Sequence, residues 1–397
     1  MKIRYFDLIF LFLLIFLFSG CRNSKEKIKE IPNGYLKTIL ISQPVDISEV
    51  DIIENLECII LEETDQSLFG AVSKMRVYKD KIYILDRMYA QALFIYTING
   101  KHISTIGANK GQGPHDFLKL SNFEIDYNND QLLVMDNWGR KFMIYDFDGN
   151  FVRRIDSKLR VTDAVLLPND YIVHAKSSDE HKLPGQSNNK IIITDYNQNI
   201  IKEGFEYDDN ENINIYSSEI IRSSSNGEII FAPRLRDTIY NVTIDSIIPK
   251  YAVDYGSNKK ISKRALDDMK EDPADPLNAD RAFIKLINNG NMCFLGENVE
   301  SDDYLYLSLG FNNYTIAVFY NKNTDNSIAL SHNRKGEKNN ESGLYSLLCS
   351  DDEGYFYGAF DSPQIDRLIP IFPELKDISD PDDLNPILFR YKIKNVE

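Results

Sequence analysis

The sequence contains few of the residues that build metal centres, and it lacks several common catalytic motifs. Its 397 residues include 4 Cys and 5 His, with no Cys-x-x-Cys, His-x-His or HExxH spacing. A zinc site therefore has no support in the sequence. The GxSxG elbow and the GK[ST] end of a phosphate-binding loop are missing as well, so neither a serine hydrolase of that type nor a P-loop enzyme is indicated.

We expect no resident cofactor. Calcium is the one cofactor that the acidic clusters suggest. The cluster after residue 262 lacks the ligand spacing and the glycine of an EF-hand loop, so a solvated charged surface is the better interpretation. Its carboxylates are Asp267, Asp268, Asp272 and Asp275.

Positive charge is in short supply. The chain has 45 Lys and Arg against 60 Asp and Glu, which gives a net charge of -15. Because such a chain repels phosphate backbones, we expect no nucleic-acid partner. Tyr and Phe are plentiful, at 23 and 22 residues. These residue types favour pleated, half-buried surfaces, so the composition indicates a protein built of strands.

An uncharged apolar run covers residues 8–18, after Lys2 and Arg4. It is shorter than the about 20 apolar residues that a membrane-spanning helix needs, and it matches a secretory signal peptide. The run ends in Phe18-Ser19-Gly20-Cys21, which resembles the lipobox of bacterial lipoproteins. A plain signal peptide or an uncleaved anchor is the alternative.

The lipobox resemblance implies cleavage after residue 20 and lipid on Cys21. Residues 21–34 would then form a polar, flexible tether, and residues 35–397 the folded domain. Acyl chains would hold the protein in the cell envelope, at the outer membrane, with the side of that membrane left open. Cys58, Cys293 and Cys349 remain, and we expect free, buried thiols in preference to a disulfide.

The main feature of the rest of the chain is a repeat with a period near fifty residues. Asp86 and Asp136 are 50 residues apart, and Gly100 and Gly149 are 49 apart. Each unit reads as a strand, a short loop, a second strand, an Asn-Gly or Asp-Gly turn and a third strand. Weaker copies occupy residues 170–201, 226–242, 303–320 and 344–393.

Six such units predict an all-β fold, a six-bladed β-propeller of four-stranded antiparallel blades. A β-sandwich pair and a β-solenoid are the alternatives. Residues 57–61 precede the first full unit and are the candidate strand that closes the ring. Residues 262–287 and 363–386 break the strand pattern, and we expect short helical insertions there, on the rim of the late blades.

Residues 106–117, IGANKGQGPHDF, resemble a segment of the six-bladed β-propeller lipoproteins of Bacteroidetes, distant relatives of NHL-repeat propellers. That family tends to show Ile-Gly…Gly-x-Gly-Pro-Gly-Glu-Phe after the first full blade, and this chain has His115-Asp116 in place of Gly-Glu. The resemblance covers residues 35–397 and implies the fold, not an activity. Gly107, Gly111 and Gly113 do not have GxGxxG spacing, so they indicate a flexible connection between blades.

The loops that follow the second strands hold the candidate ligand-binding residues. Arg87 and Tyr89 lie in one loop, Trp138 and Arg140 lie in the next, and His115 in the connection between the units joins this group. Aromatic faces suit sugar rings or peptides, and arginine suits carboxylates. Packing of Trp138 between blades is an equal alternative. The repeated aspartates before these loops, residues 86 and 136, predict turn capping in preference to metal ligation.

These features favour a non-enzymatic binding or scaffold module, monomeric and held at a membrane by its lipid, with a protein or a glycan as partner. The alternative is a metal-dependent lyase or lactonase, because some NHL-like propellers hold a divalent metal in the central channel. That alternative requires inward-facing Asp, Glu, Asn or His from several blades.

Overall fold

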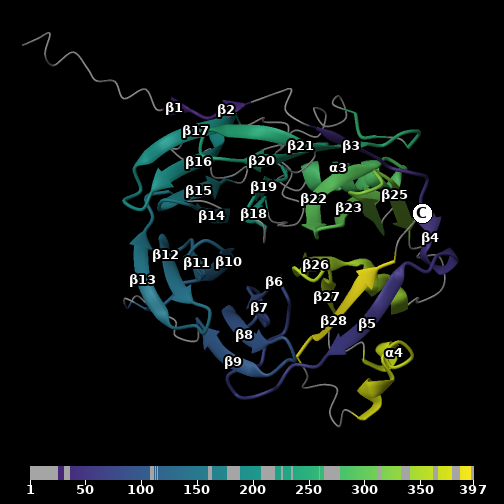
Figure 1. Cartoon of the computed structure of the whole chain (residues 1–397), viewed down its shortest axis with the longest axis horizontal. Helices are drawn as coiled ribbons and strands as arrows, with labels where there is room; N and C mark the ends of the chain where they lie inside the picture. Colours follow the sequence, from purple (N-terminus) through teal and green to yellow (C-terminus); the bar gives the residue numbers. More distant parts are fainter. Residues whose placement is uncertain are drawn as a thin grey trace, which may run out of the picture.

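The structure is a computed structural model, and its strands form six small antiparallel sheets arranged in a ring (Figure 1). This arrangement confirms the predicted six-bladed β-propeller. The structure describes residues 26–30, 36–107, 111, 113, 115–159, 163–176, 188–206, 220–224, 227–233, 236–258, 260–262, 278–311, 314–331, 340–360, 365–377 and 385–394.

The first three blades follow one another along the chain. In each of them the first strand lies nearest the centre of the ring and the fourth lies at the rim. Blade 1 consists of β6 (Lys74–Tyr78), β7 (Lys81–Asp86), β8 (Ala92–Thr97) and β9 (His102–Ile106). Blade 2 consists of β10 (Leu120–Asp126), β11 (Gln131–Asp136), β12 (Lys141–Asp146) and β13 (Phe151–Asp156). Blade 3 consists of β14 (Asp163–Leu167), β15 (Tyr171–Ala175), β16 (Asn189–Asp195) and β17 (Ile200–Glu206).

The last three blades repeat this order. Blade 4 consists of β18 (Ile221–Ser223), β19 (Ile229–Phe231), β20 (Thr238–Val242) and β21 (Ser246–Asp254). Blade 5 consists of β22 (Cys293–Glu300), β23 (Tyr304–Phe311), β24 (Tyr314–Asn321) and β25 (Ser327–Ser331). Blade 6 consists of β26 (Leu347–Ser350), β27 (Phe356–Phe360), β28 (Ile387–Ile393) and β5 (Ile53–Ile59).

The core is divided among the six gaps between neighbouring blades. In β11, Leu132 and Val134 join the cluster shared with blade 1, whereas Leu133 and Met135 join the cluster shared with blade 3. Successive strand residues point to opposite faces, so a strand covered on both faces needs a continuous apolar run. A single blade would leave both faces exposed, and the ring therefore has to close.

Closure comes from the beginning of the folded domain. β5 pairs antiparallel with β28, with Ile59 opposite Leu388 and Cys58 opposite Phe389. The predicted closing strand is thus confirmed, but its bounds differ: residues 57–61 were expected, and the strand covers Ile53–Ile59. The ring is sealed by pairing between residues more than three hundred positions apart in the sequence.

A belt of short N-terminal strands runs along the outside of blades 3, 4 and 5 (Figure 1). All of its strands pair in parallel with an outer strand: one with β17, two with β21 and one with β25. Part of the belt lies within the segment expected to be a tether. The belt strands are β1 (Glu26–Lys27), β2 (Lys29–Glu30), β3 (Lys37–Leu40) and β4 (Val45–Asp46), followed by the 3-10 turn η1 (Ile47–Glu49).

Helices occur where insertions were expected. They are α3 (Asn278–Asn288) before blade 5, and α4 (Ile365–Leu368) and η5 (Pro373–Asp377) inside blade 6. Residues 263–277, where a first helix was expected, lie outside the described residues. One strand boundary was wrong: Leu344 and Tyr345 belong to the 3-10 helix η3 (Asn340–Tyr345), and β26 begins at Leu347.

Two further sequence expectations concern the cysteines and the membrane. Cys58, Cys293 and Cys349 are free thiols, as predicted, although Cys58 is only half-buried. Cys21 and the apolar run before it lie outside the described residues. Within the described ranges, no helix combines the length and the apolar character needed to cross a membrane.

Candidate functional site

The β7–β8 loop is held in place by one buried carboxylate. Asp86 is fully buried and accepts hydrogen bonds from the amides of Met88, Tyr89 and Ala90 at 2.8, 2.9 and 3.1 Å. Its second oxygen also accepts the amide of Gly70 at 2.9 Å. All of these donors are backbone groups, which confirms the predicted turn-capping role and leaves this carboxylate saturated with hydrogen bonds.

Asp136 does the same in the next blade. It accepts the amides of Leu118, Lys119 and Gly139 at 2.8, 3.2 and 2.7 Å. In both blades the aspartate therefore ties the segment that enters the blade to the loop that follows the second strand. Loops fixed in this way are rigid platforms for whatever side chains they carry.

These platforms present large apolar side chains to solvent. Met88, Tyr89 and Trp138 are 70%, 71% and 68% exposed. The alternative of packing Trp138 between blades is thus not what the structure shows. The Tyr89 ring lies over Gly70, where an added Cβ would stand 2.8 Å from a ring carbon, and the Lys119 ammonium is 5.6 Å from the centre of the Trp138 ring.

The loops that follow second strands lie on one face of a propeller, so these residues share a face of the ring. Leu118, whose amide donates to Asp136, adds further exposed apolar surface there. We call this set the loop face: Met88, Tyr89, Leu118 and Trp138.

The other candidate residues have different surroundings. Arg140 is exposed in the same loop as Trp138 and has a left-handed backbone, with φ 48°. The His115 ring packs edge-on against Phe151, with 4.2 Å between ring centres. Phe151 begins β13 at the end of blade 2 that is distant from Trp138, because it pairs with Tyr145 near the end of β12. His115 is therefore separate from the loop face.

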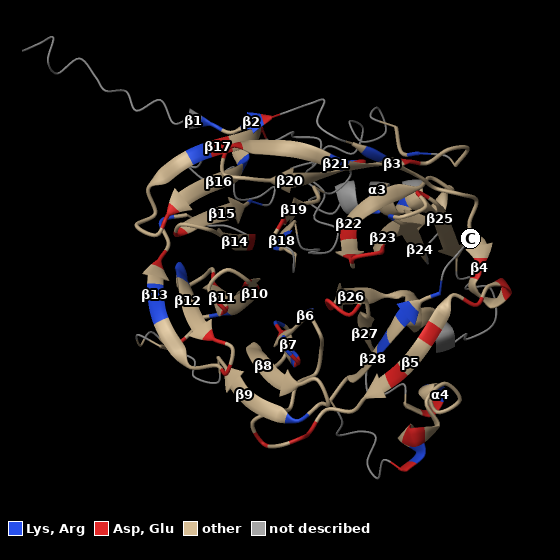
Figure 2. Cartoon of the chain, in the orientation of Figure 1, with Lys and Arg blue, Asp and Glu red and all other residues tan. Residues whose placement is uncertain are grey.

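Arg87 directly follows β7 and lies among the residues at the centre of the ring. Its amide donates to the Ser73 hydroxyl at 3.1 Å, and its side chain lines a cavity of about 190 Å³. The inner strands of the blades surround this cavity, which we call the channel cavity. Figure 2 shows the inner strands of the blades, β18 among them, around the middle of the ring.

One side of the channel cavity contains a buried ion cluster. Glu124 of β10 is 1% exposed and accepts from the Lys74 ammonium at 2.9 Å and from Arg76 Nε and Nη2 at 3.1 Å each. Lys74 also donates to the Asn122 side chain at 3.1 Å. Removal of charges from water is costly unless they are paired and hydrogen-bonded, and this cluster meets both conditions.

Asp163 of blade 3 and Arg222 of blade 4 add further polar contacts to the lining of the channel cavity. Asp163 accepts the Ile220 amide at 2.7 Å and a hydrogen bond from the Asn122 side chain. The Arg222 guanidinium donates to the backbone oxygen and to the side-chain oxygen of Asn298.

The lining of the channel cavity is more basic than acidic. Among the described residues, four cationic side chains and two carboxylates face it, in a protein whose overall charge is strongly negative. The cations are Lys74, Arg76, Arg87 and Arg222, and the carboxylates are Asp163 and Glu297.

The lyase alternative requires metal ligands that face the channel from several blades. No group of three or more His, Cys, Asp or Glu side chains gathers anywhere in the described part of the chain. His174 is fully buried in blade 3, 2.8 Å from the Thr194 hydroxyl, and burial lowers its pKa to about 3. A histidine held neutral in this way packs in a core.

Sequence reasoning missed the channel cavity. Lys74 and Arg76 stand two residues apart in a strand that is otherwise apolar, which is a signal that one strand face meets something polar. The sequence around Arg222 and Asp163 contains no such signal, because only the closed ring brings these two residues to the channel cavity.

The comparisons with known proteins establish the family and the fold. A family described as "Domain of unknown function (DUF4934)" matches residues 37–392. The curated proteins include no match.

Two solved structures have the same fold. One is a protein of Bacteroides fragilis NCTC 9343 that is named as exported; it is 19% identical, has a TM-score of 0.73, and the alignment covers 91% of this chain and 100% of that one. The other is a member of the DUF4221 family from Bacteroides vulgatus. It is 13% identical, has a TM-score of 0.53, and the alignment covers 87% of this chain and 98% of that one. Because the family match spans nearly the whole propeller, this chain belongs to the DUF4934 family.

Proposed function

We propose that this protein is an exported, lipid-anchored propeller that binds a protein partner with its loop face. The observation that carries the proposal is the group of exposed side chains held on capped loops, above all Tyr89 and Trp138. Exposed apolar side chains on rigid loops cost solvation free energy unless a partner covers them, and contiguous patches of this kind mark interaction sites.

A protein partner fits the composition of the loop face better than a glycan. Trp, Tyr, Met and Arg are the residue types enriched in protein interfaces and among their energetic hot spots. Met88 and Leu118 add flexible aliphatic surface, which matches apolar side chains better than the hydroxyls of a sugar. Arg140 lies exposed beside Trp138 and provides a charged hydrogen-bond donor there.

The experiment is cross-linking of the full-length protein in the cell envelope, followed by direct binding measurements with the purified partner. The variant is Tyr89→Ala with Trp138→Ala, and the matched control is Val152→Ala, which removes exposed apolar surface from the outer strand of blade 2. We expect the double variant to lose the partner and the control to keep it. Binding of a glycan that depends on Trp138, or equal capture by the double variant, would overturn the proposal of a protein partner.

The lipid anchor is tested separately. We propose acylation at Cys21, on the strength of the lipobox resemblance at residues 18–21 and of the exported protein with the same fold. Cys21→Ser should abolish incorporation of labelled palmitate and move the protein out of the membrane fraction. Undiminished labelling of Cys21→Ser would show that Cys21 is not the acylated residue.

Binding, and not metal-dependent catalysis, is the function that the channel cavity also supports. The lyase alternative needs several inward carboxylates or histidines, whereas the described lining is predominantly basic.

A further inference from the structure

We propose that the first belt strands place the rim of blades 3 and 4 next to the lipid bilayer, with the loop face directed away from it. This orientation deepens the proposed function and rests on one part of it, the acylation of Cys21. A tether that is free as far as residue 34, as the sequence suggested, would leave the orientation of the ring undefined.

The chain joins the propeller almost immediately after the proposed acylation site. β1 begins at Glu26, which lies opposite Lys202 of β17. Four residues separate Cys21 from β1, and a fully extended chain spans at most about 3.6 Å per residue. The acylated residue therefore lies within about 18 Å of Glu26.

This reach is short compared with the size of the ring. A compact chain of this length has a radius of gyration of about 20 Å, so the anchor cannot extend to the blades on the far side. Figure 1 shows β1 and β2 along blades 3 and 4, across the ring from β9 of blade 1. A tether free up to residue 34 would span about 50 Å and would reach any blade.

A buried side chain holds β1 and β2 on the propeller. Ile28 is 4% exposed and belongs to the apolar cluster between blades 3 and 4. Gly204 of β17 leaves room for it, because an added Cβ there would stand 2.9 Å from the Ile28 Cβ. The amide of Ile28 donates to the backbone oxygen of Glu203 at 2.7 Å, and the amide of Lys29 donates to that of Asp245 at 3.1 Å. Apolar burial and backbone hydrogen bonds thus fix this part of the belt to both blades.

The direction of β1 determines which face of the ring meets the membrane. β1 is parallel to β17, and β17 runs away from the turn that joins it to β16. β1 therefore begins towards the face that carries the turns between third and fourth strands, which we call the turn face. Its turns in blades 1 to 4 cover residues 98–101, 147–150, 196–199 and 243–245. Antiparallel neighbours alternate in direction, so the loop face lies on the opposite side of the ring from the turn face.

The segment around the start of the belt is basic, unlike the chain as a whole. Residues 22–30 contain four Lys or Arg and two Glu, whereas the net charge of the chain is -15. Lys27 and Lys29 are exposed. Anionic lipid headgroups attract basic residues that lie beside a membrane anchor, so the charge of this segment favours its contact with the bilayer.

The test measures how close single tryptophans lie to the lipid. The acylated full-length protein is reconstituted in vesicles of phosphatidylcholine and phosphatidylglycerol that contain a nitroxide-labelled headgroup, which quenches nearby tryptophan. Asn197→Trp and Asn99→Trp, each combined with Trp138→Phe, are matched, because both replace an exposed Asn in corresponding turns of blades 3 and 1. We expect quenching of Asn197→Trp to be at least about twofold stronger than that of Asn99→Trp, because the anchor reaches only the nearer blade. Trp138 of the unaltered protein should be quenched least.

Two variants test whether the belt is the cause. Insertion of about ten Gly and Ser residues after Ser24 lengthens the connection to Cys21 without altering β1, and the difference between the two turns should disappear. Ile28→Asp places a charge in the apolar cluster, should release β1 and β2, and should have the same effect. The control is Lys27→Ala, which alters an exposed neighbour and should leave the difference unchanged.

The outcomes separate this orientation from the anchor on which it rests. Equal quenching in the two turns of a protein that carries palmitate, or strong quenching of Trp138, would overturn the orientation and leave the anchor intact. A difference that survives the insertion after Ser24 would also overturn it, because the short connection would then not be its cause. Absence of palmitate from the unaltered protein would overturn the anchor proposal, and the orientation with it.

Discussion

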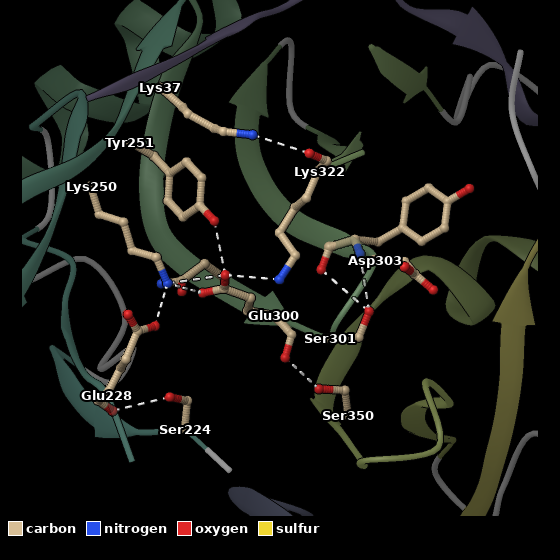
Figure 3. A network of polar contacts seen from close by, with 12 residues as sticks. Lys37, Ser224, Glu228, Lys250, Tyr251, Glu300, Ser301, Asp303, Lys322 and Ser350 are labelled. Atoms are coloured by element: carbon tan, nitrogen blue, oxygen red, sulfur yellow. Dashed lines mark hydrogen bonds and ion pairs between the residues drawn. The ribbon is translucent and has the colours of Figure 1, made fainter. Parts of the chain in front are cut away.

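Glu300 at the end of β22 accepts hydrogen bonds from the Lys250 ammonium of β21 at 2.9 and 3.1 Å, and this pair joins blade 5 to blade 4 (Figure 3). Tyr251 donates to the same carboxylate at 2.8 Å, and Lys322 donates at 3.2 Å. Lys250 also bonds Glu228 of blade 4 at 2.6 Å. The mostly buried Glu300 carboxylate thus accepts hydrogen bonds from two cations and a phenol at the interface of two blades.

The surroundings of Glu300 set its pKa. Burial acts to raise the pKa, but the attraction of Lys250 and Lys322, together with the hydrogen bonds from Lys250 and Tyr251, lowers it below the ordinary value. A carboxylate whose pKa is lower in the folded than in the unfolded state stabilises the fold above the unfolded pKa. That stabilisation is lost as the pH falls through the folded pKa.

The substitution Glu300→Gln should therefore lower the free energy of unfolding at pH 7 by about 1–3 kcal/mol, because it removes hydrogen bonds to a charged group. Urea unfolding should show the difference from the unaltered protein shrinking as the pH falls through the acid range. Glu57→Gln is the control, because Glu57 pairs with Arg390 but is half exposed, and it should cost less than about 1 kcal/mol. If Glu300→Gln lowers the free energy of unfolding by the same amount at every pH, the charge of Glu300 does not stabilise the fold.

Asp86 is expected to matter more for stability than the exposed carboxylate of Asp148 in the next blade. Asp86→Ala leaves the amides of Gly70, Met88, Tyr89 and Ala90 without their acceptor. Loss of buried hydrogen bonds to a charged group should lower the free energy of unfolding by about 2–3 kcal/mol in urea titrations. Asp148→Ala removes an exposed carboxylate that pairs with Lys81 and should change stability by less than about 1 kcal/mol. Equal effects of the two changes would refute the capping role.

Trp138 provides a direct optical test of the loop face, because it is the single Trp of the chain. With 68% of its surface exposed, its fluorescence in the native protein should peak close to that of the urea-unfolded chain. Acrylamide should quench it with similar efficiency in both states. Trp138→Phe gives the background from tyrosine. A blue-shifted native emission that is protected from acrylamide would mean that Trp138 packs between blades after all.

The sequence alone predicted the features that have a local pattern. The fifty-residue spacing of Asp86 and Asp136 predicted the blades, and the Asn-Gly and Asp-Gly turns predicted the antiparallel pairing of the second and third strands of each unit. The strand from residue 57 was predicted because its composition is strand-like and it precedes the first repeat.

The features that were missed depend on the assembled ring. The belt strands pair with β17, β21 and β25, which offer an edge only once those blades have formed. The channel cavity is missed for the same reason, because Arg222 and Lys74 approach each other only around the central axis. The surroundings of His115 also depend on the fold, because its place in a glycine-rich connection gives no sign that its ring packs on Phe151.

The belt itself can be tested with two adjacent residues of one strand. Ile39 of β3 is fully buried in the cluster between blades 4 and 5, whereas its neighbour Leu40 is 57% exposed. Ile39→Ala should lower the free energy of unfolding by about 2–5 kcal/mol, the usual cost of truncating a buried aliphatic side chain. Leu40→Ala removes a similar side chain from the same strand and should change stability by less than about 0.5 kcal/mol. Urea unfolding of both variants is the measurement. If both changes have similarly small effects, β3 does not pack on β21 in solution, and β3 contributes nothing to holding the ring together.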